Sequence, residues 1–313
     1  MQTDSIKIPA VPSKHGFLSR DGFKSSPADK PAPSQGIPLR ITILQRGFTL
    51  VELAIVMFIV ALLLGGMLLP LSAQQDVRSQ GETQKQITEA REALLGFAIA
   101  NGRLPCPASA NSNGQESFCD SASGACVVTP PLQYQSHGRC SNPHDGFLPA
   151  ATLGIAPVDT QGFAVDAWSG NPINRIRYAV TTASTSTGNP ITDNTNAFTT
   201  VDGMKTITMT KLAPDLKVCN TGTGMVSPGI ASADCAANTS LASDAVAVVY
   251  SLGKNAGTGG TGADENHNPN PQSTIAADRA FVSAQPGQNF DDQMIWLSKN
   301  ILFNRMVSAG QLP

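Results

Sequence analysis

One carboxylate, Glu52, interrupts the start of a long apolar stretch, and its position suggests a chemical role. Residues 46–72 read RGFTLVELAIVMFIVALLLGGMLLPLS, and the next charged residue after Glu52 is Asp76. A helix needs about 20 mostly apolar residues to cross a bilayer, so this stretch is predicted to span a membrane. A carboxylate inside such a helix is costly unless it is paired. We therefore expect Glu52 to have a function that involves a positively charged partner.

The residues before and after the start of this stretch resemble a known export and processing signal. Gly47 is followed by Phe48, and Glu52 occupies the fifth position counted from Phe48. This arrangement is similar to the N-terminal signal of type IV pilins and type II secretion pseudopilins. The resemblance implies that prepilin peptidase cuts after Gly47 and methylates the amino group of Phe48. It also implies that Glu52 and Thr49 serve assembly, with the Glu52 carboxylate meeting the charged N-terminus of a neighbouring subunit.

The charge distribution predicts the orientation in the membrane. Basic residues outnumber acidic residues in residues 1–47, and Lys/Arg-rich flanks remain in the cytoplasm. We therefore expect a bacterial inner-membrane protein with a cytoplasmic N-terminus and a periplasmic head. Residues 1–47 form the expected leader, which is long for that family; either translation starts further downstream, near residue 40, or the leader is truly long. The acidic remainder gives no indication of nucleic-acid binding.

The pattern of the remaining residues predicts an α+β, pilin-like fold. Residues 48–72 would form the transmembrane or filament-core half of a long helix, and residues 73–101 its amphipathic half. In that second half, apolar side chains recur at helical spacing at Val77, Ile87, Ala90, Leu94, Leu95 and Ala98. Asn101 and Gly102 then provide a helix stop. Residues 102–313 would form a β-rich periplasmic head, an antiparallel sheet on which the helix packs.

Several segments of the head have strand-like or helix-like patterns. Strands are predicted at residues 174–180, 204–212 and 245–252, with weaker candidates at 280–283 and 294–297. Residues 298–309 are predicted to form a short helix that Ser298 caps. Long loops are expected at residues 181–202 and 253–274, where Gly, Asn, Ser, Thr and Pro dominate.

Six cysteines all lie beyond the apolar stretch, which suits an oxidising periplasm. Six cysteines allow 15 pairings, and the sequence does not choose among them. Cys219 and Cys235 are separated from the others and form the favoured pair. For the remaining four, nested Cys106–Cys140 and Cys119–Cys126 bridges are favoured. A zinc site built from His137, Cys140 and His144 is the alternative, but it lacks a C-x-x-C partner.

Two loop motifs extend the resemblance to the major pseudopilin of type II secretion. Residues 166–172 (DAWSGNP), followed by Tyr178, are similar to the D-P-W-G-N-P…Y turn of that protein. Residues 251–260 (SLGKNAGTGG), with Asp291, Asp292 and Trp296, resemble its S-x-G-x-D-G…GG…D-x-x-W segment, although Asn255 stands where the family has aspartate. The family's loop binds calcium, so the resemblance implies Ca²⁺ as a candidate cofactor. Its candidate ligands are Asp264, Glu265, Asp291 and Asp292; the alternative is a solvated acidic loop without an ion.

Common catalytic motifs are absent from the sequence, including G-x-S-x-G, H-E-x-x-H and the phosphate-binding G-x-x-x-x-G-K-[ST]. We therefore expect a structural subunit and not an enzyme. The resemblance implies a minor pilin or pseudopilin, whose partners are other subunits, prepilin peptidase and an inner-membrane assembly platform. The alternative is a standalone membrane-anchored periplasmic module for binding or adhesion.

Overall fold

The computed structural model describes residues 47–126, 134–168, 174–182, 196–207, 209–225, 233–257, 262–271, 278–287 and 289–312. The side chains of residues 66–72 are not described. The chain divides into two units, residues 1–58 and residues 59–313. Helix α1 (Leu50–Asn101) contributes residues to both units.

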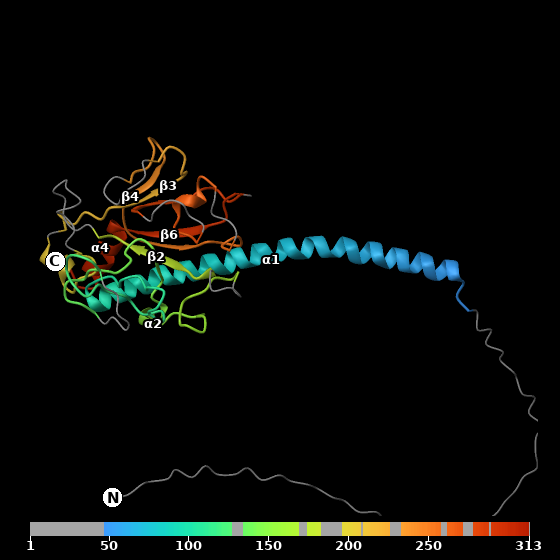
Figure 1. The fold of residues 1–313 in the computed structure, drawn as a ribbon, viewed down its shortest axis with the longest axis horizontal. Helices are drawn as coiled ribbons and strands as arrows, with labels where there is room; N and C mark the ends of the chain where they lie inside the picture. Colours follow the sequence, from blue (N-terminus) through green and yellow to red (C-terminus); the bar gives the residue numbers. More distant parts are fainter. Residues whose placement is uncertain are drawn as a thin grey trace, which may run out of the picture. The chain divides into compact units, whose positions relative to one another are not determined.

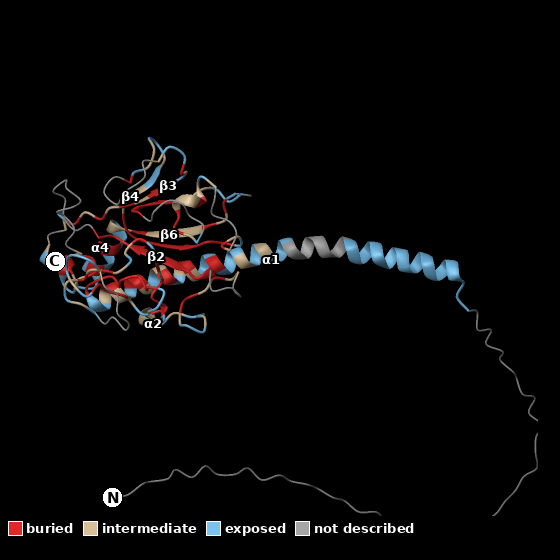
Figure 2. Cartoon of the chain, in the orientation of Figure 1, coloured by how far each residue is buried: buried red, intermediate tan, exposed pale blue. Residues whose placement is uncertain are grey.

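The first half of α1 has an exposed apolar surface. Its large apolar side chains between Leu50 and Leu64 are all exposed, as the pale blue part of the helix in Figure 2 shows. Within the described residues, no helix has an apolar stretch long enough to cross a membrane. Residues 66–72, which complete the span predicted at 48–72, lie outside the residues whose side chains are described.

The second half of α1 has the amphipathic stripe expected from its sequence. Ile87, Ala90, Leu94 and Ala98 are fully buried, and Figure 2 shows this part of α1 in red beside the sheet. Val77 departs from the prediction, because its side chain is 69% exposed. The buried stripe therefore starts further along the helix than the periodicity indicated. The helix ends as predicted, at Asn101.

Within the described residues, six strands form one sheet, which Figure 1 shows with α1 along one face. The strands are β1 (Gly146–Phe147), β2 (Arg177–Val180), β3 (Leu216–Cys219), β4 (Ser240–Ser251), β5 (Ala280–Val282) and β6 (Gln293–Ser298). Strand β4 is central and pairs antiparallel with β2, β3 and β6. Strand β5 pairs with β3 in parallel, so the sheet is mixed and mostly antiparallel, whereas the sequence predicted an antiparallel sheet.

Four short helical segments complete the described part of the head. They are α2 (Ala150–Leu153), α3 (Gly203–Thr206), the 3₁₀ turn η2 (Glu265–His267) and α4 (Lys299–Ser308). Helix α4 confirms the predicted C-terminal helix, and the Ser298 side chain accepts a hydrogen bond from the Ile301 N–H. Sequence analysis predicted neither β1 nor β3.

The strand predicted at residues 204–212 is wrong. This segment contains α3, followed by a turn around residues 209–211, while residue 208 is not described. Met204 and Leu212 are both fully buried in the core next to α1. Their burial explains the alternating pattern without a strand, because tertiary contacts override β-propensity in such a short segment.

From Ala245 to Ser251, strand β4 is buried on both faces of the sheet. Val246 and Val249 face the cluster that also holds Leu94 of α1, whereas Val248 and Tyr250 belong to a second cluster with Phe281. A strand covered on both faces reads as a continuous apolar run. This explains why residues 245–250 read AVAVVY and do not alternate.

Candidate functional site

The residues of the N-terminal motif cap the first turn of α1. Thr49 immediately precedes the helix, and its Oγ1 accepts a hydrogen bond from the Glu52 N–H at 3.2 Å. This is the usual bond of an N-cap threonine. In a full capping box, the glutamate side chain would bond back to the threonine N–H. No such bond is present within the described residues. There the Glu52 carboxylate is exposed and has no partner.

Three of the four candidate calcium ligands lie together. One carboxylate oxygen each from Glu265, Asp291 and Asp292 lies within 4.8 Å of the others. Glu265 and Asp292 are buried, whereas Asp291 is half-buried. The fourth candidate, Asp264, is not part of this group: its Oδ1 accepts hydrogen bonds from Thr221 Oγ1 at 2.8 Å and from the Gly222 N–H at 2.6 Å.

The loop after β4 holds this acidic group in place. Asn255 donates from its backbone N–H to Asp291 Oδ2 at 3.0 Å and from its side chain to Glu265 Oε1 at 3.1 Å. Gly253 has a φ of +63°, and a Cβ at this position would lie 2.5 Å from the Asp291 carbonyl oxygen. Only glycine fits this close approach. The other oxygen of Asp291, Oδ1, is buried and has no hydrogen-bond partner.

Burial changes the protonation of these carboxyl groups. It raises the pKa of Asp292 to about 8, against the lowering effect of the hydrogen bond from Asn268. The neighbouring carboxylates Glu265 and Asp291 raise the Asp292 pKa further. Burial is also the main cause of the raised pKa of Asp291. Three neighbouring carboxylates repel one another unless protons or a cation neutralise part of their charge. Their ligand atoms are all oxygens, which calcium prefers.

The two motifs that resemble the pseudopilin meet in the structure. Ser251, from the second motif, donates a hydrogen bond to Asp166 Oδ2 at 2.5 Å, and Asp166 Oδ1 accepts the Trp168 N–H at 2.9 Å. Burial raises the pKa of Asp166 to about 6. Sequence reasoning missed this contact, which links residues far apart in the chain. Residues 169–172 of the first motif lie outside the described residues.

The cysteines form three disulfides, with no free cysteine among the described residues. The pairs are Cys106–Cys140, Cys119–Cys126 and Cys219–Cys235, the same three pairs that the sequence favoured.

The disulfide at Cys140 removes the central ligand of the alternative zinc site. His137 Nδ1 accepts a hydrogen bond from the Arg139 N–H at 3.0 Å. His144 is buried, and burial together with the charge of Arg279 lowers its pKa to about 3. His144 therefore serves as a neutral core residue.

Comparison with protein families matches residues 44–68 to the prokaryotic N-terminal methylation motif. No curated protein and no solved structure matches the chain. The match covers the Gly47–Phe48 junction and Glu52, the residues that the sequence singled out. The chain thus carries the N-terminal methylation motif typical of type IV pilins and pseudopilins, at the start of a long helix that packs on a mostly antiparallel sheet.

Proposed function

We propose that this protein is a structural subunit of a type IV pilus or a type II secretion-like filament, as a minor pilin or pseudopilin. Prepilin peptidase would cut it after Gly47 and methylate Phe48. The observation that carries this proposal is the methylation motif at residues 44–68, which includes Glu52 in the first turn of α1. The large size of the chain fits a minor member of the family.

The unpaired Glu52 carboxylate supports a role in assembly. The Glu52 backbone N–H donates to Thr49 Oγ1, but the Glu52 carboxylate has no partner among the described residues. In the proposed filament, Glu52 pairs with the methylated amino group of Phe48 on a neighbouring subunit. An unpaired charge is disfavoured in an apolar environment, so this pairing makes correct assembly more favourable than a subunit alone.

The exposed apolar side chains between Leu50 and Leu64 support a membrane location before assembly and a filament core afterwards. An apolar surface of this extent marks contact with lipid or protein. The three disulfides are consistent with a periplasmic head. The expected partners are therefore other subunits, prepilin peptidase and the inner-membrane assembly platform.

Replacing the Glu52 carboxylate tests the proposed assembly step. We expect Glu52→Gln to abolish incorporation into sheared filaments while the protein stays in the membrane fraction. Glu82→Gln is the matched control, because Glu82 is an exposed acid on the same helix that pairs only with Arg78. A standalone membrane-anchored module would tolerate both substitutions equally, and that result would refute the subunit proposal.

The N-terminus of the mature protein tests the processing step directly. Mass spectrometry of protein purified from cells with prepilin peptidase should give an N-terminal peptide that begins with methylated Phe48. In cells without the peptidase, the peptide that spans Gly47 and Phe48 should remain intact. A mature N-terminus at any other residue would show that the processing proposal is wrong.

We further propose that Glu265, Asp291 and Asp292 bind a calcium ion in the head. The buried, unpartnered Asp291 Oδ1 supports a cation near this oxygen. Calcium chloride should then raise the unfolding temperature of the wild-type protein at pH 7, and Asp292→Asn should weaken this response. Asp244→Asn is the control, since Asp244 lies outside the group. Equal responses of all three proteins would exclude the site.

A further inference from the structure

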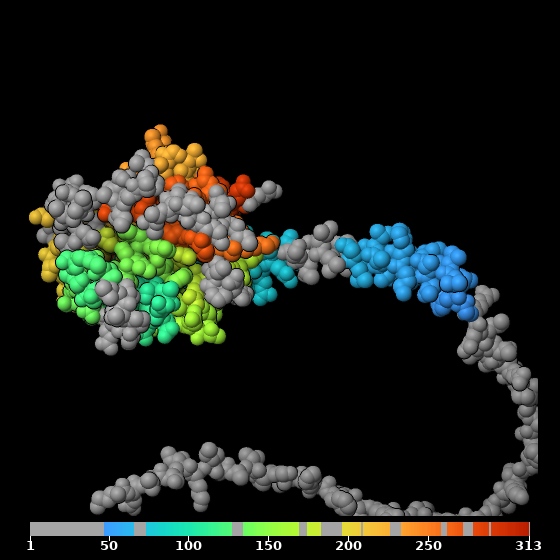
Figure 3. All heavy atoms as spheres, in the orientation of Figure 1, coloured from blue at the N-terminus to red at the C-terminus, as the bar shows by residue number. Residues whose placement is uncertain are grey.

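Two disulfides near the start of the head are nested. The Cys106–Cys140 bond encloses the Cys119–Cys126 bond, so the chain joins the first of these four cysteines to the last. Residues 120–125, inside the inner bond, are mostly exposed and belong to the green region on the left side of the head in Figure 3. The native pairs therefore do not follow the order of the cysteines along the chain.

The two nested bonds lie next to each other in the folded head. The Cys119 N–H donates a hydrogen bond to the Arg139 carbonyl oxygen at 2.9 Å, and Cys119 Sγ lies 3.4 Å from the carbonyl oxygen of Cys140. Since Cys106 is bonded to Cys140 and Cys126 to Cys119, all four sulfur atoms lie in the same region. Wrong pairings among them are thus available to the chain while it folds.

Both chain distance and export order favour a wrong pairing. Cys119 is less than half as far along the chain from Cys106 as Cys140, which is 34 residues away. Because the chance of closing a flexible loop falls roughly as the 3/2 power of its length, Cys106 should meet Cys119 about four times as often as Cys140. In the proposed orientation, these two cysteines also reach the periplasm before Cys126 does. Oxidation during export therefore favours a Cys106–Cys119 bond.

The contacts that select the native pairs come from residues that are exported later. Arg139 donates from Nη1 to the Ser121 carbonyl oxygen at 3.2 Å and from Nη2 to the Gly124 carbonyl oxygen at 2.8 Å. Its guanidinium group thus holds the loop inside the inner disulfide. The next residue, Cys140, is buried in the main hydrophobic cluster. Both residues follow the other three cysteines in the chain, so the native pairs become the most stable ones only after this region is complete.

We propose that the head obtains its native disulfides through a periplasmic thiol–disulfide isomerase, which exchanges the wrong bonds Cys106–Cys119 and Cys126–Cys140 for the native ones. A thiol oxidase of the same compartment supplies the first two bonds. This inference rests on the proposed function, because it requires that the head is exported and that its N-terminal end is exported first. Arg139 acts as a positioning residue, which makes the native pairing the stable product of the exchange.

The exchange is balanced in atoms and electrons. The isomerase thiolate attacks Cys106 Sγ, which gives a mixed disulfide and a Cys119 thiolate. The Cys119 thiolate attacks Cys126 Sγ, forms the inner bond and releases the Cys140 thiolate. The Cys140 thiolate then attacks Cys106 Sγ in the mixed disulfide and frees the isomerase thiolate. Two bonds of the chain are present before and after these steps, so the exchange needs no oxidant or reductant.

Disulfide mapping of the full-length chain, expressed in bacteria with and without the isomerase, tests this inference. Free thiols are blocked with a maleimide, and the protein is cut with trypsin and with a protease specific for acidic residues. Each of the four cysteines then lies on its own peptide, because cleavage sites separate them at Glu116, Asp120 and Arg139. With the isomerase, the native pairs should dominate. Without it, the Cys106–Cys119 peptide should exceed the Cys106–Cys140 peptide about fourfold or more.

Removing the inner bond provides the matched control. Cys119→Ser combined with Cys126→Ser leaves only bonds between consecutive cysteines, which should form equally with and without the isomerase. The Cys219–Cys235 bond also joins consecutive cysteines, so it is a control within the wild-type sample. Native pairing of the wild-type chain without the isomerase, or an equal loss of native pairs in the double variant, would overturn the inference.

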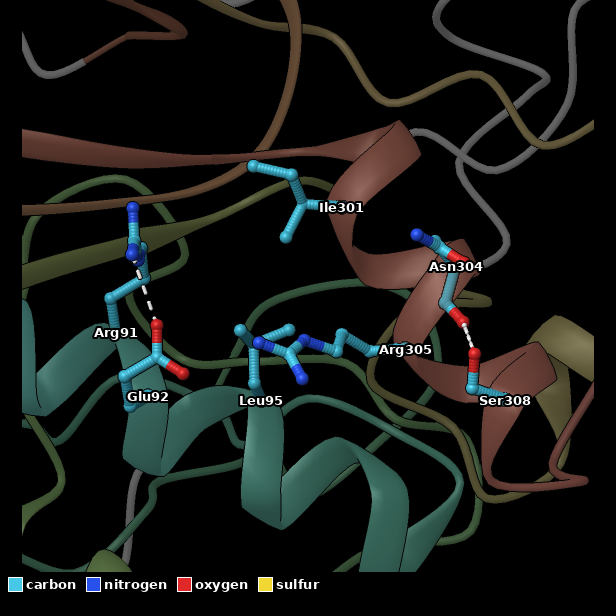
Figure 4. Close-up of a pocket in the computed structure, with 7 residues that line it drawn as sticks. All are labelled: Arg91, Glu92, Leu95, Ile301, Asn304, Arg305 and Ser308. Carbon is cyan, nitrogen blue, oxygen red and sulfur yellow. Dashed lines mark hydrogen bonds and ion pairs between the residues drawn. The ribbon is translucent and has the colours of Figure 1, made fainter.

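A second variant tests the selecting role of Arg139. Arg139→Lys keeps the charge and the trypsin site but loses the planar, two-armed contact, so it should raise the share of the Cys106–Cys119 peptide several-fold in bacteria that have the isomerase. Arg305→Lys is the matched control, because Arg305 lines the groove between α1 and α4, and no cysteine is among the residues that line this groove in Figure 4. Equal shares in the two variants would overturn the role of Arg139.

These experiments also separate the inference from the proposed function. Native pairs in the absence of the isomerase overturn the inference alone, because the proposed assembly step depends on Glu52 and not on the route to the disulfides. A chain whose cysteines all remain free thiols would show that the head does not enter an oxidising compartment, and that result would overturn both.

Discussion

Asp292→Asn should stabilise the head near neutral pH when no calcium is present. The Asp292 carboxyl is buried, and its pKa is about 8 in the folded protein. In the unfolded chain, an aspartate has a pKa of about 3.9. Between these two values the folded state holds a proton that the unfolded state releases. The stability contributed by this group is therefore complete below pH 4 and is lost as the pH rises to about 8.

The size of this effect follows from the difference between the two pKa values. Each pH unit in this range corresponds to about 1.4 kcal/mol, so the loss at pH 7 is at most about 4 kcal/mol. Asparagine does not ionise, and its side-chain oxygen can still accept the hydrogen bond that Asn268 donates at 2.7 Å. Its amide hydrogens would also face the carboxylates of Glu265 and Asp291.

Urea unfolding of the mature protein in detergent, with EDTA present, measures this difference. Between pH 5 and pH 7, the free energy of unfolding of Asp292→Asn should rise by about 3 kcal/mol relative to wild type. Comparing the two proteins at each pH cancels the contributions of the other titrating groups. Asp244→Asn should show no such trend, because Asp244 lies outside the acidic group. A constant difference, or one that falls with pH, would refute the assignment of a buried, protonated Asp292.

Three further predictions concern the disulfides, the core and His144. Replacing both Cys219 and Cys235 with serine opens a loop of 16 residues and should lower the free energy of unfolding by about 3 kcal/mol in urea titrations, with m-values as a control for the unfolded state. Leu94→Ala leaves a cavity between α1 and the sheet and should lower the free energy of unfolding by about 2–5 kcal/mol in the same measurement. A decrease below about 1 kcal/mol would contradict the packing of α1. The pKa of His144 is about 3 in the folded state, below its unfolded value, so this group favours unfolding as the pH falls from about 6.5 towards 3. NMR titration should show no protonation of the His144 ring between pH 5 and 8, and a midpoint in that range would show that the ring is not buried.

The sequence predicted correctly those parts of the structure that depend only on residues close together in the chain. The long helix, its end at Asn101 and the cap of α4 by Ser298 all follow from side chains within a few positions of each other. The disulfides were favoured from cysteine spacing alone, and the structure has the same pairs. The strand predicted at residues 204–212 was wrong because local alternation also arises when a short helix and a following turn bury Met204 and Leu212.

The grouping of the candidate calcium ligands also depends on more than the local sequence. The sequence proposed four acidic ligands, but neighbours in the chain need not point the same way: Glu265 joins Asp291, whereas Asp264 binds Thr221 and Gly222. The pairing of β5 with β3 in parallel also had no local signal, because it depends on a crossover between distant segments.

The sequence by itself determined the N-terminal segment of this protein: the methylation motif at residues 44–68, the apolar stretch and Glu52 within it. These properties depend on covalent order and on side-chain polarity, which need no tertiary contacts. Only the tertiary structure decided which charges remain unpaired, because ion pairs such as Lys254–Asp76 join residues that are far apart in the chain. It likewise decided which carboxylates are buried, since burial depends on packing around β4 and not on any local pattern. Asp292 therefore gained its significance from the fold.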